Sequence, residues 1–235
     1  MNYFTFAGKS SQDFGIFIDE NTTYNAAVRE YETAAVPGRN GDLTIDSGRY
    51  SNVEVGYKCN IGNIGAGFKA NMNAFKAFLL SNVGYKRLED TYQPDSYRLA
   101  RVRSAPDPET FRDIAGAFEV VFDCKPQRFL KSGETAQTFT SSGTLVNPTP
   151  YTALPLIRVY GTGTLRVGST TVVINSANTY TDLDCDIQDA FKGSTNCNGN
   201  ITLSSGDFPT LPAGSTGISF SGISKVEVTP RWWTL

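Results

Sequence analysis

The clearest pattern of hydrophobic and polar positions in the chain lies between residues 67 and 85. Apolar side chains recur there at the spacing of one face of an α-helix, and lysine and asparagine occupy positions off that face. An asparagine and a glycine follow, two residue types that tolerate the left-handed conformation in which helices often end. The pattern predicts an amphipathic helix that packs on a sheet through Phe68, Met72, Phe75, Phe78 and Leu79.

Alternation typical of β-strands flanks this helix on both sides. Residues 43–61, LTIDSGRYSNVEVGYKCNI, are rich in β-branched and aromatic side chains. Residues 85–103 divide into two predicted strands around a polar turn at Gln93-Pro94-Asp95, and residues 116–125 form a further predicted strand. The first half is therefore predicted to be an α+β domain, a sheet or split barrel with one packed helix.

The second half consists of short alternating runs without a helical stripe. Runs such as PLIRVYG, TTVVIN and KVEVTP recur about every 8–14 residues between glycine, asparagine, serine or proline, which is typical of an antiparallel β-sandwich. Charge also falls, since 16 of the 21 basic and 17 of the 23 acidic side chains lie in residues 1–139. The Ser/Thr/Gly-rich segment at 131–150 favours a connection. The predicted domains of this mainly β chain are 1–139 and 140–235.

Charge and histidine content narrow the classes of function. The formal net charge is -2, which argues against nucleic-acid binding through phosphate neutralisation. The chain has no histidine, so it lacks the commonest general base and the commonest metal ligand. Gly8-Lys9-Ser10 is not preceded by the glycine of a phosphate-binding loop, since Tyr3 stands at that position. We therefore expect a protein that is not an enzyme and binds no cofactor, metal or nucleic acid.

The cysteines and the N-terminal segment indicate where the protein is made. Cys59, Cys124, Cys185 and Cys197 are scattered without a CxxC pair, which favours buried free thiols over a disulfide framework or a zinc site. The first residues lack the basic and apolar regions of a signal peptide, and no stretch approaches the ~20 apolar residues of a membrane span. Synthesis in a cytoplasm without membrane insertion is expected.

An acidic cluster at residues 182–189 is the strongest candidate for metal or catalytic chemistry. The EF-hand calcium loop needs a glycine at its sixth and a glutamate at its twelfth position, where this chain has isoleucine and glycine. A carboxylate-based glycosidase using two of Asp182, Asp184 and Asp186 is the enzymatic alternative, although neighbouring aspartates are poorly placed to flank a scissile bond. Alternation with apolar residues instead predicts a strand with its aspartates facing solvent.

Two segments are candidates for contact between subunits. The first, at residues 36–46, holds two turn signals that let the backbone approach a neighbour closely, with an arginine fork between them. Its candidate residues are Pro37, Gly38, Arg39, Asn40, Gly41 and Asp42. The second is the hairpin at 85–103, where Arg87, Arg98 and Arg101 could set the register between neighbours. A plain hairpin loop and a solvated surface hairpin remain the alternatives for these two segments.

Six motifs resemble, in order along almost the whole chain, those of the siphophage distal tail protein family, often called Dit. FAGKSSQDFGI resembles the opening strand and turn of the family, and VPGRNGDLTIDSGRY its signature loop and following strand. The helix with GYKRLEDTYQPDSYRLARV and the strand FEVVFDCKPQRF resemble the remainder of the first domain. NPTPYTALPLIRVYGTG and GDFPTLPAGSTGISFSG resemble the start and a late hairpin of the second domain.

The resemblance implies a structural virion protein at the end of a long non-contractile phage tail. Its first domain would form a ring, usually a hexamer, and its second a galectin-like β-sandwich. The ring would join the tail tube protein to the tail-tip or baseplate proteins, contacting the tail-associated lysin or tail fibre hub and in some members the receptor-binding proteins. The family brings no catalytic residues. A ring needs two different complementary patches on each subunit.

Arg231-Trp232-Trp233 contains both tryptophans of the chain. Because a tryptophan buries a large area, one of them is predicted to close the sandwich core. Exposed tryptophans can instead stack on sugars or anchor a partner. The alternative function is therefore a carbohydrate-binding module that aids host-surface adhesion through the C-terminal domain, with Trp232 and Trp233 as its contacts.

Overall fold

The computed structural model describes residues 1–21, 25–61, 67–104, 109–111, 115–177 and 179–235. The described chain is mainly β-strand with a single α-helix, which confirms the predicted fold class. It separates into two compact units, residues 1–128 with residue 235, and residues 129–234. This division falls before the Ser/Thr/Gly-rich segment, ahead of the predicted boundary between 139 and 140, because β10 (Ala115–Leu130) carries the chain from one unit into the other.

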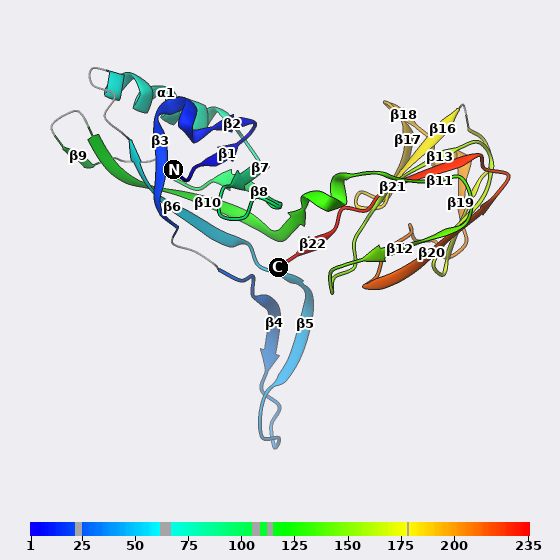
Figure 1. The fold of residues 1–235 in the computed structure, drawn as a ribbon. Helices are drawn as coiled ribbons and strands as arrows, with labels where there is room; N and C mark the ends of the chain where they lie inside the picture. The colour runs from blue at the N-terminus through cyan, green and yellow to red at the C-terminus, as the bar shows by residue number, and fades with distance from the viewer. Residues whose placement is uncertain (22–24, 62–66, 105–108, 112–114, 178) are drawn as a thin grey trace. The chain divides into compact units, whose positions relative to one another are not determined.

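The first unit is built on one antiparallel sheet (Figure 1). Its strand order is β2-β1-β7-β8-β10-β6-β3, and β9 pairs with β10. A short 3₁₀ helix (Ser11–Phe14) follows β2, and α1 (Phe68–Ser81) follows β6. The strand bounds are β1 (Phe4–Phe6), β2 (Lys9–Ser10), β3 (Ile16–Asn21), β6 (Val53–Ile61), β7 (Lys86–Asp90), β8 (Ser96–Val102) and β9 (Glu109–Phe111).

Aromatic side chains form much of the core of the first unit. The helix buries Phe68, Met72, Phe75 and Leu79, as the sequence pattern predicted. Between helix and sheet, the ring of Phe4 stacks on that of Tyr57 at 5.2 Å and meets that of Phe122 edge-on at 5.4 Å. Burial of such aromatic side chains supplies much of the free energy that holds a helix on a sheet.

A long hairpin leaves this sheet (Figure 1). It consists of β4 (Arg29–Ala34) and β5 (Leu43–Tyr50), which pair only with each other, and we call residues 29–50 the arm. Placing all of residues 43–61 in the main sheet was therefore wrong for residues 43–50. The break at 51–52 separates the arm from β6, whose alternate residues Val53, Val55 and Tyr57 are buried.

The second unit is an antiparallel sandwich of two sheets, as predicted. The six-stranded sheet has the order β11-β21-β13-β16-β17-β18, and the five-stranded sheet has the order β12-β20-β14-β15-β19. Inward residues such as Ile157, Val159, Leu165, Val226 and Val228 are fully buried. The bounds are β11 (Gln137–Phe139), β12 (Gly143–Asn147), β13 (Leu156–Tyr160), β14 (Gly163–Val167), β15 (Thr170–Ile174), β16 (Tyr180–Asp184), β17 (Asp189–Lys192), β18 (Thr195–Asn196), β19 (Ile201–Leu203), β20 (Gly214–Ser221), β21 (Lys225–Thr229) and β22 (Trp233–Thr234).

Candidate functional site

The predicted contact loop is the tip of the arm. The residues from Pro37 to Asp42, including Asn40, are exposed, and Arg39 N donates to Val36 O at 3.1 Å in a turn. Gly38 and Gly41 have φ of +79° and +82°, a conformation that favours glycine, and nothing lies within 4 Å of a Cβ placed on either. No described residue pairs with the Arg39 guanidinium. The tip therefore presents a preformed turn with an available cation.

The two faces of the arm differ in chemistry. Leu43 lies opposite Ala34 and Ile45 opposite Glu32, so the apolar side chains of Ala34, Leu43 and Ile45 share one face with the carboxylate of Glu32. Leu43 is 42% exposed and Ile45 50% exposed. The other face carries Thr33 opposite Thr44 and Tyr31 opposite Asp46. An apolar face without cover on a two-stranded hairpin is a feature of contact surfaces, because such surface stabilises a complex when it is buried.

Ionic contacts hold the base of the arm. Arg29 Nε donates to Asp46 Oδ1 at 3.0 Å and to Oδ2 at 2.9 Å, and Arg29 Nη1 donates to the Tyr50 hydroxyl at 3.2 Å. The hydrogen bond from Arg29, followed by that from the Gly48 amide, lowers the pKa of Asp46. Arg49 and Glu30 form a second ion pair at 3.0 Å. Cross-strand pairs of this kind keep the hairpin in one register.

The hairpin at 85–103 separates its three candidate arginines by strand parity. Successive side chains of a strand point to opposite faces. Arg98 lies opposite Leu88, which is buried, so its side chain starts from the core-facing side of the sheet. Arg87 lies opposite Leu99, on the same face as Arg101. Arg87 and Arg101 can therefore act on one surface, and Arg98 has a different environment.

The surface around Arg101 is a charged hollow. Its volume is about 510 Å³, and its lining includes Arg101, Arg103 and Asp123. Arg101 Nε donates to Asp123 Oδ2 at 2.7 Å, and Asn52 Nδ2 donates to Asp123 Oδ1 at 3.0 Å. Arg87, on the same face, pairs with Glu89 at 2.5 Å. These paired charges suit a surface that selects its partner by electrostatic complementarity.

The structure places the two tryptophans differently. Trp232 is 3% exposed in the core of the second unit. Trp233 is half-buried, its ring stacks on Tyr151 at 4.5 Å, and its Nε1 donates to Thr152 O at 3.0 Å. A Cβ on Gly133 would lie 2.3 Å from Trp232 N, so a glycine is needed where the chain passes this point. Trp232 therefore closes the core, and only Trp233 offers surface to a ligand.

The predicted solvent-facing strand of aspartates is wrong for two of its members. Asp182 is 3% exposed and Asp184 is 9% exposed. The reason is that an arginine covers each carboxylate, since Arg158 donates to Asp182 at 2.7 and 2.9 Å and Arg231 donates to Asp184 at 2.7 and 2.9 Å. Bidentate arginine–carboxylate pairs of this geometry are strong, and they fix the conformations of both side chains. A glycosidase instead needs a carboxyl of raised pKa.

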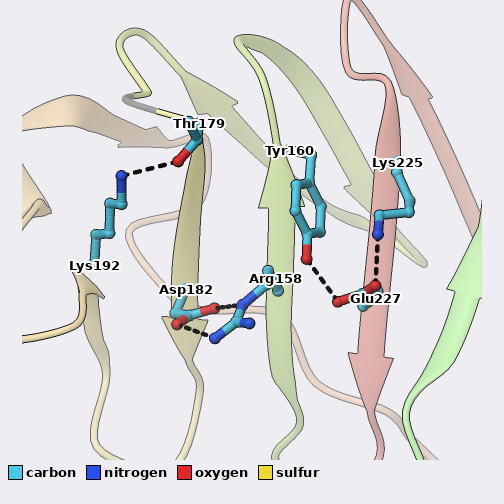
Figure 2. A network of polar contacts seen from close by, with 7 residues as sticks. All are labelled: Arg158, Tyr160, Thr179, Asp182, Lys192, Lys225 and Glu227. Atoms are coloured by element: carbon cyan, nitrogen blue, oxygen red, sulfur yellow. Dashed lines mark hydrogen bonds and ion pairs between the residues drawn. The ribbon is translucent and has the colours of Figure 1, made fainter.

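Figure 2 shows the polar network on one face of the six-stranded sheet. Besides the Arg158–Asp182 pair, the Tyr160 hydroxyl donates to Glu227 Oε2 at 3.0 Å and Lys225 Nζ donates to Glu227 Oε1 at 2.7 Å. Lys225 lies 4.0 Å from the centre of the Tyr160 ring. Lys225 and Arg158 therefore cover one face each of the Tyr160 and Tyr180 rings, and a sugar could not stack on these covered faces.

We expect acid to lower the free energy of unfolding of the second unit, because the Asp184 carboxylate becomes protonated. Burial opposes its ionisation, but the hydrogen bonds and charge of Arg231 and the amides of Asp186 and Ile187 outweigh burial and lower the pKa of Asp184. A lowered folded-state pKa gives stability that is present above the unfolded value of about 3.9 and is lost as pH falls through the folded value.

The Asp184→Asn variant should therefore lose less unfolding free energy than the natural chain as the pH falls through this window. Denaturant titrations over a pH series measure it, with Asp207→Asn as the control because Asp207 is an exposed carboxylate of the same unit. Equal acid sensitivity of the natural chain and Asp184→Asn would contradict the assigned role of Arg231.

All four cysteines are free and buried, as predicted. Burial raises the pKa of Cys59, Cys124 and Cys185 to about 12, which makes these thiols weak nucleophiles near neutral pH. Among the described residues, no group of three or more His, Cys, Asp or Glu could hold a metal ion. No helix in the described ranges has the length and apolar character needed to span a membrane.

Comparison with known proteins gives matches among solved structures. No protein-family model matches the sequence, and no curated protein matches it. The SPP1 Dit protein, described as a paradigm of the hub adsorption apparatus in phages infecting Gram-positive hosts, matches with a TM-score of 0.78 at 14% identity, over 100% of both chains. A chain of the phage P2 baseplate, in its activated conformation with Ca, matches with a TM-score of 0.56 at 11% identity, over 97% of both chains. The chain therefore has the fold of the SPP1 Dit protein.

Proposed function

We propose that this chain is a distal tail protein, a structural component of the hub at the end of a long non-contractile phage tail. The observation that carries the proposal is the likeness to the SPP1 Dit protein, which extends over the full length of both chains. The ordered sequence motifs support it independently, since they rest on the residues alone. The proposed role is non-catalytic and needs no cofactor.

The proposed assembly is a closed ring of identical subunits, a hexamer. Ring closure needs two different patches on each subunit. One patch is the arm, with Leu43 and Ile45 on its apolar face and Arg39 at its tip. The second is the charged surface of the first unit that holds Arg87 and Arg101. Burial of the apolar face supplies affinity, and the charged groups set the register between neighbours.

The proposed partners follow from a place at the tail end. The ring, formed by the domain predicted at 1–139, joins the tail tube protein to the tail-associated lysin or tail fibre hub protein. The domain predicted at 140–235 is a galectin-like scaffold that can carry receptor-binding proteins. The self-paired network of Figure 2 and the burial of Trp232 favour this scaffold role over sugar binding. The protein would be assembled into the virion in the host cytoplasm.

Immunogold microscopy of phage particles that carry this gene tests the proposed role. Antibodies raised against the purified chain should label the distal end of the tail, opposite the capsid. Label on the capsid, along the whole tail shaft, or only in the soluble fraction of the lysate would contradict a hub role. Particles of a phage without the gene serve as the control for specificity.

A further inference from the structure

Two arginines in the first unit lack partners for buried donors. Arg98 lies on β8 and Arg128 on β10, which are neighbouring strands. Arg98 Nη1 and Arg128 Nε are both buried and have no hydrogen-bond partner in the described part of the chain. An unpaired buried donor is costly, so in a folded protein it calls for a bound water, ion or ligand.

Arg128 has two hydrogen-bond partners near this pair of arginines. Its Nη1 donates to Gln93 Oε1 at 2.5 Å, and its Nη2 donates to the main-chain oxygen of Leu235 at 2.8 Å. Neither Arg128 nor Arg98 forms an ion pair with an Asp or Glu side chain within the described ranges. Two guanidinium groups are therefore close together without an Asp or Glu side chain paired to either of them, which is unusual for arginines in a partly buried setting.

Asp90 is the carboxylate whose charge acts on Arg128, and both of its oxygens already accept hydrogen bonds from other groups. Asp90 Oδ2 accepts from the Tyr57 hydroxyl at 2.7 Å, and Asp90 Oδ1 accepts from the amides of Tyr92 and Gln93, each at 2.9 Å. Burial and then the neighbouring charge of Arg98 lower the pKa of Arg128, and Asp90 only partly opposes them. Asp90 therefore keeps its charge but is not an acceptor for Arg98 Nη1 or Arg128 Nε, and these two donors remain open to an anion.

Both guanidinium groups line one small hollow, which we call the arginine hollow. Its volume is about 100 Å³. A water takes roughly 30 Å³, so the space suits a few waters or one small anion and is too small for a nucleotide or a sugar chain. Amide side chains complete its polar lining, which consists of Asn25, Gln93, Arg98 and Arg128 with Ala26 and Leu235.

We propose that the arginine hollow binds a single oxyanion, a carboxylate or phosphate group. The planar fork of a guanidinium matches the paired oxygens of these groups and donates to two of them at once. An oxyanion between Arg98 and Arg128 would accept from the unpaired Nη1 and Nε and would offset the repulsion between the two charges. The inference rests on these residues alone and is independent of the proposed role in a phage tail.

Calorimetric unfolding of the full chain in sodium phosphate, sodium acetate and sodium chloride of equal ionic strength tests the site. Phosphate, acetate or both should raise the Tm of the first unit above its value in chloride. The expected rise is about 4–8 °C once the anion exceeds its Kd several-fold. A rise with acetate identifies carboxylates as ligands, and a rise with phosphate alone identifies a tetrahedral anion. No rise with either anion would overturn the proposal.

Substitution of Arg98 separates binding from structure. Arg98→Gln should abolish the rise and leave the Tm in chloride unchanged or higher, because it removes a like charge beside Arg128. Lys86→Gln, which removes an exposed charge from the neighbouring strand β7, should keep the full rise. An undiminished rise in Arg98→Gln overturns the site. The Nε–H resonance of Arg128 in the natural chain gives a check that needs no variant, since it should shift on addition of the stabilising anion and not of chloride.

Discussion

A chain whose arm is replaced by a tight turn should fold normally and remain a monomer at concentrations where the intact chain assembles. The variant joins Arg29 to Tyr50, the last facing pair at the base of the arm, through Asn-Gly, which favours a two-residue hairpin turn. The arm contributes no side chain to the buried core of the first unit, so its loss should leave the Tm of that unit almost unchanged. Sedimentation velocity and calorimetry measure both outcomes.

Two double variants that keep the arm compare the contributions of its two faces to self-association. Leu43→Ser with Ile45→Ser removes two exposed apolar side chains, each of which contributes about 1.5 kcal/mol or more when buried. Self-association should therefore weaken by roughly a hundred-fold. Thr33→Ser with Thr44→Ser, on the opposite face, is the matched control and should weaken it little. If the two pairs of substitutions weaken self-association equally, or if the armless chain still assembles, the arm is not part of the interface.

The Trp232→Ala variant should lower the free energy of unfolding of the second unit by about 3–5 kcal/mol, the usual cost of truncating a buried large aromatic side chain. Trp232 is 3% exposed and belongs to the buried hydrophobic core of the second unit. Because both tryptophans lie in this unit, denaturant titration followed by tryptophan fluorescence reports on it specifically. The remaining Trp233 supplies the signal in the variant.

Trp233→Ala is the matched comparison, and its cost should be about 1 kcal/mol, that of a stacked pair at the surface. The two variants also separate the scaffold role from the sugar-binding alternative. If the second unit is a scaffold, Trp232→Ala should lower the free energy of unfolding, and neither variant should change binding to a glycan array. A larger loss of stability from Trp233→Ala, or loss of glycan binding by a folded Trp233→Ala, would contradict the scaffold role.

The sequence predicted elements whose pattern is local. The helix was predicted with its buried face because Phe68, Met72, Phe75 and Leu79 all serve one surface, so their spacing reports directly on packing. The alternation of Val53, Val55 and Tyr57 did the same for β6. In such segments the local period and the tertiary environment agree, and period alone is then informative.

The arm was not predicted because the alternation in β5 resembles that of a strand in the main sheet. Leu43 and Ile45 alternate with polar residues as in a half-buried strand, yet the side chains of residues 43–50 are almost all exposed. The charged residues of β4 (REYETA) are a signal of this exposure that the sequence does carry. A residue pattern records which side chains alternate and not whether a second layer covers them. The tip at Pro37–Asp42 was identifiable because its glycines require positive φ, a property of the local backbone.

Pairs distant in sequence account for the remaining differences. Arg231 reaches Asp184 across 47 positions, and no local signal links the two residues or shows that the carboxylate is buried. The separation of Arg98 from Arg87 and Arg101, in contrast, follows from strand parity, which could have been applied to the sequence. Only the fold brings Arg98 to Arg128 and creates the arginine hollow.

Electron microscopy of the purified, intact chain in negative stain tests the central claim of self-assembly most directly. Images should show closed particles of uniform diameter with a central opening, and their class averages should show six-fold symmetry. The armless chain, prepared at the same concentration, should show single-chain particles only. Particles of single-chain size from the intact chain at every concentration, or open filaments without closure, would contradict the account.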